Sequence, residues 1–379
     1  MNISEQERIK NLKLVNSSDR IRGVKGVATR IALAGFNKIF NPIKSDYVHT
    51  LPEKLIFKPF TDSKVYGTTH YGIMISDLPA PFNFLACASI LGNPGFRTFD
   101  LNFACKDTPH NMVTISHGTN VTSNNGFYVY TRKQGFNSQP DGSLLQFGDH
   151  VEISGTYPNF ALKSHDQDCK IDLQLTATGE ITWFARSFAY DHLSLLTRYT
   201  GTIEYQGEIH QVSGLCTYEH ARGVALQKFN KNPIPFEYKV PWDFFTYQVL
   251  NLDKDTQLVM THCRALNDSL LTAGYIRKAN QASYGIKDYV HFEVLELEPE
   301  PFVNGDGIHM LVPKRFRWIF KDQEQGIDLE INATVDCKWL FGLGRGYISG
   351  YQWHGYSNGQ PKQGRGYVEY VDVRYPVTK

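Results

Sequence analysis

Hydrophobic and polar residues alternate along most of the chain from about residue 55 onward. Segments such as HVEISGTYP, KIDLQLTATGEITWFARSF and YTGTIEYQGEIHQVSGLCTYEH place an apolar residue at nearly every second position. This period predicts β-strands. Turn-forming pairs, among them Asn-Gly, Asp-Gly and Thr-Gly, separate the segments. The pattern therefore predicts short antiparallel strands arranged as a sandwich or barrel.

One segment, VALQKFNKNPIPFEYKVPWD at 224–243, interrupts this pattern; it is rich in Pro and Asn and has no clear period. Strand-like segments resume after it and cover a similar length, which predicts two barrels or sandwiches in tandem. We expect three parts: a basic, partly helical extension at 1–54, a first β-domain at 55–230 and a second β-domain at 231–379.

The first fifty residues contain many lysines and arginines and few acids. Within them, GVKGVATRIALAGFNKIF at 23–40 has the spacing of a short helix with one apolar and one basic face. Two interpretations stay open. The favoured one is an ordinary helix docked on the body of the protein. The other is a membrane-surface anchor, or a flap over an apolar pocket.

Composition and charge restrict the possible partners. Aromatic residues make up 13% of the chain and there are 31 glycines, which suits β-architecture. The formal net charge is +1 and no basic stripe is visible, so nucleic acid is not an expected partner. The six cysteines show no C-x-x-C pair and are expected to be buried and reduced. Neither a secretory signal nor a membrane-spanning apolar segment is recognisable, so we expect a cytoplasmic protein.

No cofactor motif is recognisable. GLGRGYISG at 342–350 lacks the G-x-G-x-x-G spacing, and strand rather than helix follows it. The thirteen histidines never cluster at metal-ligand spacing. We therefore expect neither a metal nor an organic cofactor, and the sequence indicates no partner protein.

Polar and aromatic residues gather beside glycines at strand ends, most clearly in LCTYEHARG at 215–223. In an extended strand Glu219 and His220 point to opposite faces. If the face with Glu219 looks inward, this carboxyl enters an apolar cavity, where burial raises its pKa and suits it to acid/base work. His220 then packs on the other face, toward the domain seam. The alternative, weighed equally, is that Glu219 forms an ion pair with Arg222 or Lys228.

Three segments resemble the two-domain lipocalin-fold superfamily that includes AttH-like proteins, carotenoid hydratases of the hydroxyneurosporene synthase type and cyclases described as Diels–Alderases. YTGTIEYQGEIHQVSGLCTYEHARG (199–223) resembles the family's acid-His turn, and GYQWHGYSNGQPKQGRGYVEYVD (350–372) its closing Tyr-Trp-x-Gly … Gly-x-Gly-Tyr-x-Glu signature. THYGIMI (69–75) resembles its entry strand more weakly. The resemblance implies two lipocalin-like β-barrels with a ligand pocket where they meet. It also implies a proton-donor role for Glu219, where the hydratases carry Asp.

We therefore predict a protein that binds a hydrophobic small molecule, such as a lipid, terpenoid or polyketide. The first hypothesis is cofactor-free hydration, isomerisation or cyclisation; the second is a non-catalytic lipid carrier whose N-terminal helix contacts a membrane. The predicted catalytic residues are Glu219 and His220. The predicted substrate-binding residues are His70, Tyr71, Tyr218, Arg222, Tyr351, Trp353, His354 and Tyr367.

Overall fold

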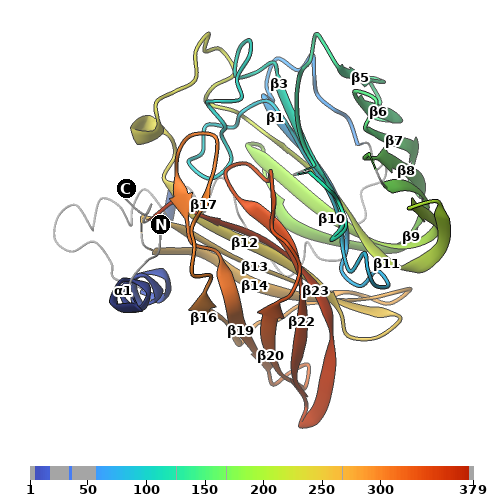
Figure 1. Ribbon diagram of the computed structural model, residues 1–379, viewed down its shortest axis with the longest axis vertical. Helices are drawn as coiled ribbons and strands as arrows, with labels where there is room; N and C mark the ends of the chain where they lie inside the picture. The colour runs from blue at the N-terminus through green and yellow to red at the C-terminus, as the bar shows by residue number, and fades with distance from the viewer. Residues whose placement is uncertain are drawn as a thin grey trace.

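The computed structural model describes residues 5–17, 34–35, 57–124, 126–167, 169–266 and 268–374. Nearly all of its elements are strands, which confirms the predicted all-β fold with a short helical segment near the N-terminus (Figure 1). In chain order the elements are α1 (Glu5–Asn16), β1 (Thr68–Ile75), β2 (Leu85–Leu91), β3 (Met112–Gly118), β4 (Phe127–Thr131), β5 (Phe136–Ser138), β6 (Leu144–Phe147), β7 (Val151–Thr156), β8 (Asn159–His165), β9 (Cys169–Arg186), β10 (Tyr190–Tyr205), β11 (Glu208–Gly223), the 3-10 turn η2 (Phe236–Tyr238), β12 (Trp242–Asn251), β13 (Thr256–Ala265), β14 (Asp268–Lys278), β15 (Tyr284–Gly285), β16 (Tyr289–Leu297), β17 (Phe302–Val303), β18 (His309–Met310), β19 (Pro313–Asp322), β20 (Ile327–Val335), β21 (Leu340–Phe341), β22 (Tyr347–Ser357) and β23 (Gln360–Asp372).

Strands β1 to β11 form the first sheet, in the order β4-β3-β2-β1-β11-β10-β9-β8-β7-β6-β5. The two strands at the ends of this order, β4 and β5, follow one another in the chain, and a bridge between Thr131 and Gly135 joins them. The sheet therefore curls into a nearly closed barrel. Closure of this kind protects the sheet edges from pairing with other chains.

The second sheet runs in the order β15-β14-β13-β12-β23-β22-β20-β19-β16, with β21 paired to β22, and it forms a half-barrel. Strands β17 and β18 make a separate small hairpin. Residues 224–241 connect the two sheets, and the predicted boundary between residues 230 and 231 lies within this connection. The two sheets pack against each other through an apolar cluster that β1, β2 and β9 share with β12, β13, β14 and β23 (Figure 1). Hydrogen bonds from Tyr247 to Glu219 and from Arg277 to Ser194 add contacts with β11 and β10.

Both faces of the strands at this seam are buried. Along β1, Tyr71, Ile73 and Ile75 point into the packed core of the first barrel. Met74, between two of them, instead joins a cluster that includes Tyr247 and Tyr367 of the second sheet. Residues of β11 alternate between the two faces in the same way, and Cys216 and Tyr218 lie in the barrel core. The residues that alternate with them, including Glu219, therefore face the second sheet.

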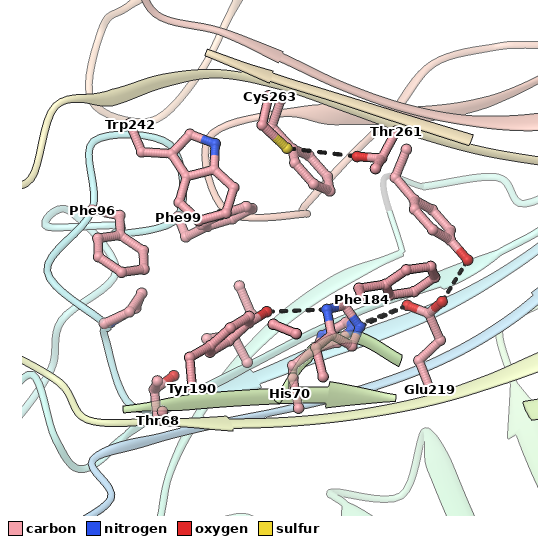
Figure 2. A pocket seen from close by; sticks show the side chains of 18 of the residues that line it. Thr68, His70, Phe96, Phe99, Phe184, Tyr190, Glu219, Trp242, Thr261 and Cys263 are labelled. Carbon is pink, nitrogen blue, oxygen red and sulfur yellow. Dashed lines mark hydrogen bonds and ion pairs between the residues drawn. The ribbon is translucent and has the colours of Figure 1, made fainter. Parts of the chain in front are cut away.

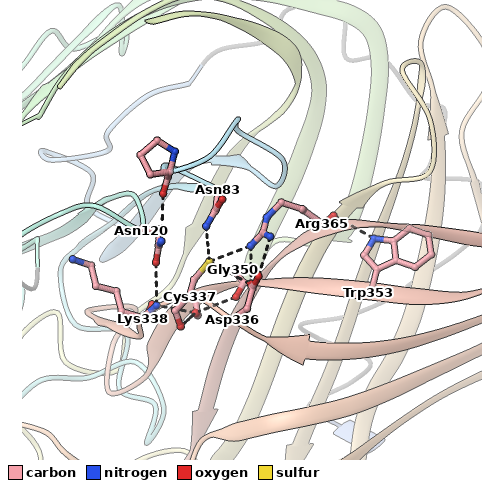
Figure 3. A network of polar contacts seen from close by, with 10 residues as sticks. Asn83, Asn120, Asp336, Cys337, Lys338, Gly350, Trp353 and Arg365 are labelled. Carbon is pink, nitrogen blue, oxygen red and sulfur yellow. Dashed lines mark hydrogen bonds and ion pairs between the residues drawn. The ribbon is translucent and has the colours of Figure 1, made fainter. Parts of the chain in front are cut away.

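Polar contacts also tie the two sheets together (Figure 3). Asn83, in the connection between β1 and β2, donates a hydrogen bond to Sγ of Cys337, 3.5 Å away. The guanidinium of Arg365 on β23 binds both carboxylate oxygens of Asp336 at 2.9 and 2.7 Å and also contacts Cys337 at 3.2 Å. Asn120 accepts a hydrogen bond from the backbone N–H of Lys338 at 3.2 Å. Loops of the first sheet are thereby held against the second.

Helix α1 docks on the second sheet. The side chain of Asn16 donates to the carbonyl of Val294 at 2.6 Å and accepts from its N–H at 2.9 Å. The helix predicted at 23–40 lies outside the described residues apart from residues 34 and 35. In the described part of the chain, no helix combines the length and the apolar character that a membrane crossing needs. All six cysteines are free thiols, and five of them are buried.

Candidate functional site

A cavity of about 130 Å³ lies between the two sheets (Figure 2). Its lining is mostly apolar: Phe96, Phe99 and Trp242 gather at one end, and Glu219 lies at the other. Further apolar lining comes from Ile90, Phe184, Phe245, Leu270, Leu271 and Leu343. A largely apolar pocket with a few converging polar groups is the usual form of a small-molecule site.

Strand pairing brings two histidines beside Glu219. In the sheet, β11 lies between β1 and β10, and Ala221 of β11 is the register partner of both His70 and His192. Glu219 is two residues before Ala221 on β11, so its side chain shares the same face. The imidazole rings are 5.9 Å apart between centroids. The small side chain of Ala221 leaves room for both rings.

The glycine at position 72 leaves space for the His70 ring to approach the carboxylate of Glu219. Gly72 is the register partner of Glu219. A Cβ atom at this position would lie only 3.1 Å from Nε2 of His70 and 2.8 Å from Cε of Met74. The absence of a side chain therefore lets the His70 ring lean over the strand toward the carboxylate.

Glu219 is almost completely buried, with 2% of its surface exposed. Its Oε1 accepts a hydrogen bond from the hydroxyl of Tyr247, and its Oε2 lies 3.2 Å from Nε2 of His192. Burial pushes the pKa of Glu219 upward. The hydrogen bonds from His192 and the Tyr247 hydroxyl outweigh burial and bring the pKa below its ordinary value. The predicted increase in this pKa is therefore wrong, because the donors around the carboxylate could not be seen in the sequence.

The two histidines are held by their other ring nitrogens. Nδ1 of His70 lies 2.8 Å from the carbonyl oxygen of Ser89, and Nδ1 of His192 lies 3.0 Å from the hydroxyl of Tyr190. Nε2 of His70 is 3.9 Å from Oε2 of Glu219. Burial, together with the nearby His192, lowers the pKa of His70 to about 4. His70 is therefore neutral at physiological pH.

The second sheet contributes another carboxyl group, Glu369 of β23. It lines the cavity, is 3% exposed and is the register partner of Tyr247 on β12. Tyr367 donates a hydrogen bond to its Oε1 at 2.7 Å. Burial raises the pKa of Glu369 well above its ordinary value, and the nearby negative charge of Glu219 acts in the same direction. The surroundings of Glu219 thus favour its ionised form, whereas those of Glu369 favour its protonated form.

Both the sequence and the fold match known proteins. A family model described as a family of unknown function, DUF6670, matches residues 88–379. The chain is a member of DUF6670. No curated protein matches its sequence.

Solved structures relate this DUF6670 protein to a wider fold group. The AttH protein of Nitrosomonas europaea aligns over 86% of this chain and 99% of its own, with a TM-score of 0.54 and 12% identity. Kievitone hydratase of Nectria haematococca aligns over 88% and 98%, with a TM-score of 0.50 and 14% identity. These matches confirm the resemblance to the AttH-like lipocalin-fold superfamily, and at such identities they establish the fold alone.

Three of the ten predicted site residues line the cavity: Glu219, His70 and Arg222. Arg222 does not pair with Glu219, because its Nε binds Oδ2 of Asp191 at 2.9 Å and its guanidinium stacks on Tyr66. Lys228, the other candidate partner, donates to backbone carbonyls of Ser63 and Tyr66. The alternative ion pairs of Glu219 are therefore not formed. Tyr367 reaches the site indirectly, through its hydrogen bond to Glu369.

The other six lie elsewhere. Tyr71, Tyr218 and His220 are on the opposite face, toward the interior of the first barrel, where Nε2 of His220 lies 3.0 Å from the carbonyl of Lys58. The prediction placed Glu219 on the inward face of the strand and His220 toward the boundary between the two sheets. The structure shows the opposite: Glu219 faces the second sheet, and His220 faces the interior of the first barrel. Tyr351 and Trp353 are in the core of the second sheet, and His354 is exposed on β22.

Sequence reasoning missed several polar residues of the lining, and four of them surround the two carboxyl groups or belong to them: Tyr190, His192, Tyr247 and Glu369. A signal existed for Glu369, because it ends the Gly-x-Gly-Tyr-x-Glu signature and shares a strand face with Tyr367. No comparable signal existed for His192, which meets Glu219 only through the register of β10 with β11.

Replacing Ala221 by leucine is expected to weaken binding of an apolar ligand by at least ~10-fold, because the larger side chain fills the space between the two histidine rings. Overpacking here costs about 1–3 kcal/mol of stability. Displacement of the fluorescent probe N-phenyl-1-naphthylamine would measure the change. Ala161→Leu on β8, away from the cavity lining, is the control. Equal binding by wild type and Ala221→Leu would show that ligands do not enter between the histidines.

Proposed function

We propose that this protein binds an unsaturated, mostly apolar small molecule between its two sheets and adds water to, or shifts, a carbon–carbon double bond. The observation that carries the proposal is the pair of buried carboxyl groups in one cavity, whose surroundings shift their pKa values in opposite directions. Glu219 is stabilised as an anion by several donors, whereas Glu369 is stabilised in its neutral form. Pairs of carboxyl groups held in different environments commonly divide the acid and base roles.

Glu369 is suited to be the acid. Tyr367 occupies Oε1 as a donor, so the proton of the neutral carboxyl belongs on Oε2. Transfer of this proton to one alkene carbon leaves a positive charge on the neighbouring carbon. The anionic Glu219 and the aromatic ring of Phe184, which both line the cavity, can stabilise that charge.

His70, together with Glu219, is suited to be the general base. Nδ1 of His70 faces a carbonyl, which can only accept a hydrogen bond, so the neutral ring carries its proton on Nδ1 and a lone pair on Nε2. Water that attacks the positive carbon gives up a proton to this lone pair, and Glu219, 3.9 Å away, stabilises the imidazolium. In an isomerisation no water attacks. Instead, the same lone pair removes a proton from the carbon next to the positively charged one, and the double bond forms again in a new position. The proton then returns to Glu369, which completes one turnover.

The lining limits the substrate class. Aromatic and aliphatic side chains surround most of the cavity, and the ionisable groups lie together at one end. A terpenoid, a prenylated aromatic or an unsaturated lipid suits such a site. One structural relative with the same fold bears the name hydratase, which supports addition of water as one of the two reactions.

Isotopes from the solvent label the product of either reaction, whatever the substrate. The protein is incubated in ²H₂¹⁸O with the ligands extracted from it and with farnesol and retinol, and the products are analysed by mass spectrometry. Hydration incorporates ¹⁸O and ²H, whereas isomerisation incorporates ²H alone. Recovery of bound ligand without label would contradict the proposal and favour the non-catalytic carrier.

A further inference from the structure

We infer that His70, His192 and Glu219 form a binding site for one divalent transition-metal ion, with its open position facing the apolar part of the cavity. The inference goes beyond the proposed function, because an ion can bind whether or not the protein turns over a substrate. It also differs from the expectation of no metal, which rested on the spacing of histidines along the chain. The fold joins residues that are far apart in sequence.

The ligand atoms are close to the geometry that such an ion requires. The three donor atoms, one from each side chain, lie within 4.8 Å of one another. The separation between His192 Nε2 and Glu219 Oε2 is 3.2 Å, and that between His70 Nε2 and the same oxygen is 3.9 Å. Metal–ligand bonds of about 2.0–2.2 Å place ligand atoms about 3.0–3.5 Å apart. One pair already satisfies this range, and small side-chain rotations bring in the third atom.

Each of the three ligands has an outer partner that orients it. The Ser89 carbonyl holds Nδ1 of His70, and the Tyr190 hydroxyl lies beside Nδ1 of His192. The Tyr247 hydroxyl binds Oε1 of Glu219, which leaves Oε2 directed at the histidines. Metal-binding histidines characteristically have their second nitrogen held by a carbonyl or another polar group. The outer contacts of an ion site are therefore already present.

A positive charge between His70 and Glu219 would stabilise their arrangement. Because the Ser89 carbonyl fixes the proton of His70 on Nδ1, the lone pair of Nε2 points toward a carboxylate oxygen. Two acceptors that face each other in a buried site repel unless a donor or cation lies between them. A bound ion satisfies both, and it takes the place of the proton through which Nε2 of His192 donates to Glu219.

The donor set indicates the class of ion. Two imidazoles and one carboxylate suit Zn²⁺, Co²⁺ or Fe²⁺, whereas Mg²⁺ and Ca²⁺ prefer oxygen ligands. Three protein ligands leave a position for water, whose pKa the ion lowers. With an ion bound, Nε2 of His70 would be a ligand and could not accept a proton, so the ion-bound water would supply the oxygen nucleophile in place of the base role proposed for His70.

The test is direct titration of untagged, chelator-treated protein with ZnCl₂ by calorimetry, repeated with CoCl₂ and followed by visible absorption. We expect one Zn²⁺ per chain and a cobalt spectrum typical of a low-coordinate site with nitrogen ligands. His70→Ala, His192→Ala and Glu219→Gln should each weaken Zn²⁺ binding by more than about 100-fold. Tyr190→Phe, which removes an outer contact, should weaken it by about 10-fold.

Two controls address other histidines. His150 stacks on Tyr128 within a separate group that includes His117 and His165, and His354 is exposed on β22. His150→Ala and His354→Ala should leave Zn²⁺ binding unchanged. Binding that survives His70→Ala and His192→Ala, or wild-type protein that takes up no Zn²⁺ and gives no cobalt spectrum, would overturn the inference. The second outcome does not depend on whether any variant folds.

The metal test and the test of the proposed reaction can fail separately. Glu369→Gln should retain Zn²⁺ binding while it loses isotope incorporation. If wild-type protein binds no ion yet incorporates isotope, the metal site is wrong and the reaction stands. If it binds one ion at His70, His192 and Glu219 but incorporates no isotope, the site stands and the reaction is wrong.

Discussion

Glu369→Gln is expected to slow isotope incorporation by about 10²–10⁴-fold, the range typical for loss of a general acid. Glutamine has nearly the same shape and can still accept the hydrogen bond from Tyr367, but its amide group cannot release a proton to carbon. Ligand binding and fold should therefore be retained. Probe displacement and circular dichroism would verify both before rates are compared. Equal rates for the variant and the wild type would remove Glu369 from the mechanism.

The pH dependence of folding stability tests the pKa of Glu369 independently of any reaction. Because the folded protein raises the pKa of Glu369 above its ordinary 4.5, the folded state keeps a proton that the unfolded chain releases. The contribution of Glu369 to stability is thus complete below pH 4.5 and is lost as the pH rises through the folded pKa. Glu369→Gln lacks this loss, so its stability relative to wild type should increase with pH above 4.5. Denaturant unfolding of chelator-treated protein at several pH values measures the difference; a constant difference would mean that the pKa is not raised.

Lys239→Met is expected to lower the free energy of unfolding by about 3–5 kcal/mol. Nζ of Lys239 lies 2.8 Å from Oδ2 of Asp100, and both side chains are fully buried. The backbone N–H of Gly95 and the side chain of Gln227 also donate to this carboxylate. Removal of the lysine leaves a buried negative charge without its cation, which costs far more than loss of the same contact in water.

Two comparisons make the Lys239 prediction specific. Lys170 and Glu204 form an ion pair at 3.1 Å, but both side chains are largely exposed, so Lys170→Met should change stability by less than about 1 kcal/mol. The double variant Asp100→Asn/Lys239→Met removes both charges and should recover much of the loss. Urea unfolding of all three proteins provides the comparison. A loss in Lys239→Met no larger than that in Lys170→Met would show that Asp100 is not ionised in the folded protein.

The sequence contains enough information for the fold class because alternation is a local property of each strand. HVEISGTYP contains β7, and CTYEHARG ends β11, as the pattern predicts. The direction of each face could not be predicted for β1 and β11. Both of their faces are buried, one in the barrel core and one against the second sheet, so hydrophobicity does not distinguish them. The reversal of Glu219 and His220 follows from this ambiguity.

The site also depends on distances that no local pattern contains. Tyr247 meets Glu219 only because the second sheet packs on the first, and His192 meets it through the pairing of β10 with β11. The closing signature did contain Glu369, but the prediction selected the aromatic residues around it. Burial beside another carboxyl group, which gives Glu369 its unusual proton affinity, is a property of the assembled sheets.

The proposed acid and the proposed base lie on different sheets, and this placement has a consequence for how substrate range can evolve. His70, His192 and Glu219 belong to the first sheet, whereas Glu369 belongs to the second. The spacing between proton donor and acceptor is therefore set by the packing of two separate bodies, and not by one backbone. Substitutions in remote contacts between the sheets, such as that of Asn83 with Cys337 or that of Asn120 with Lys338, can alter this spacing without touching a lining residue. Related proteins could accordingly acquire longer or shorter substrates while their reactive groups stay the same.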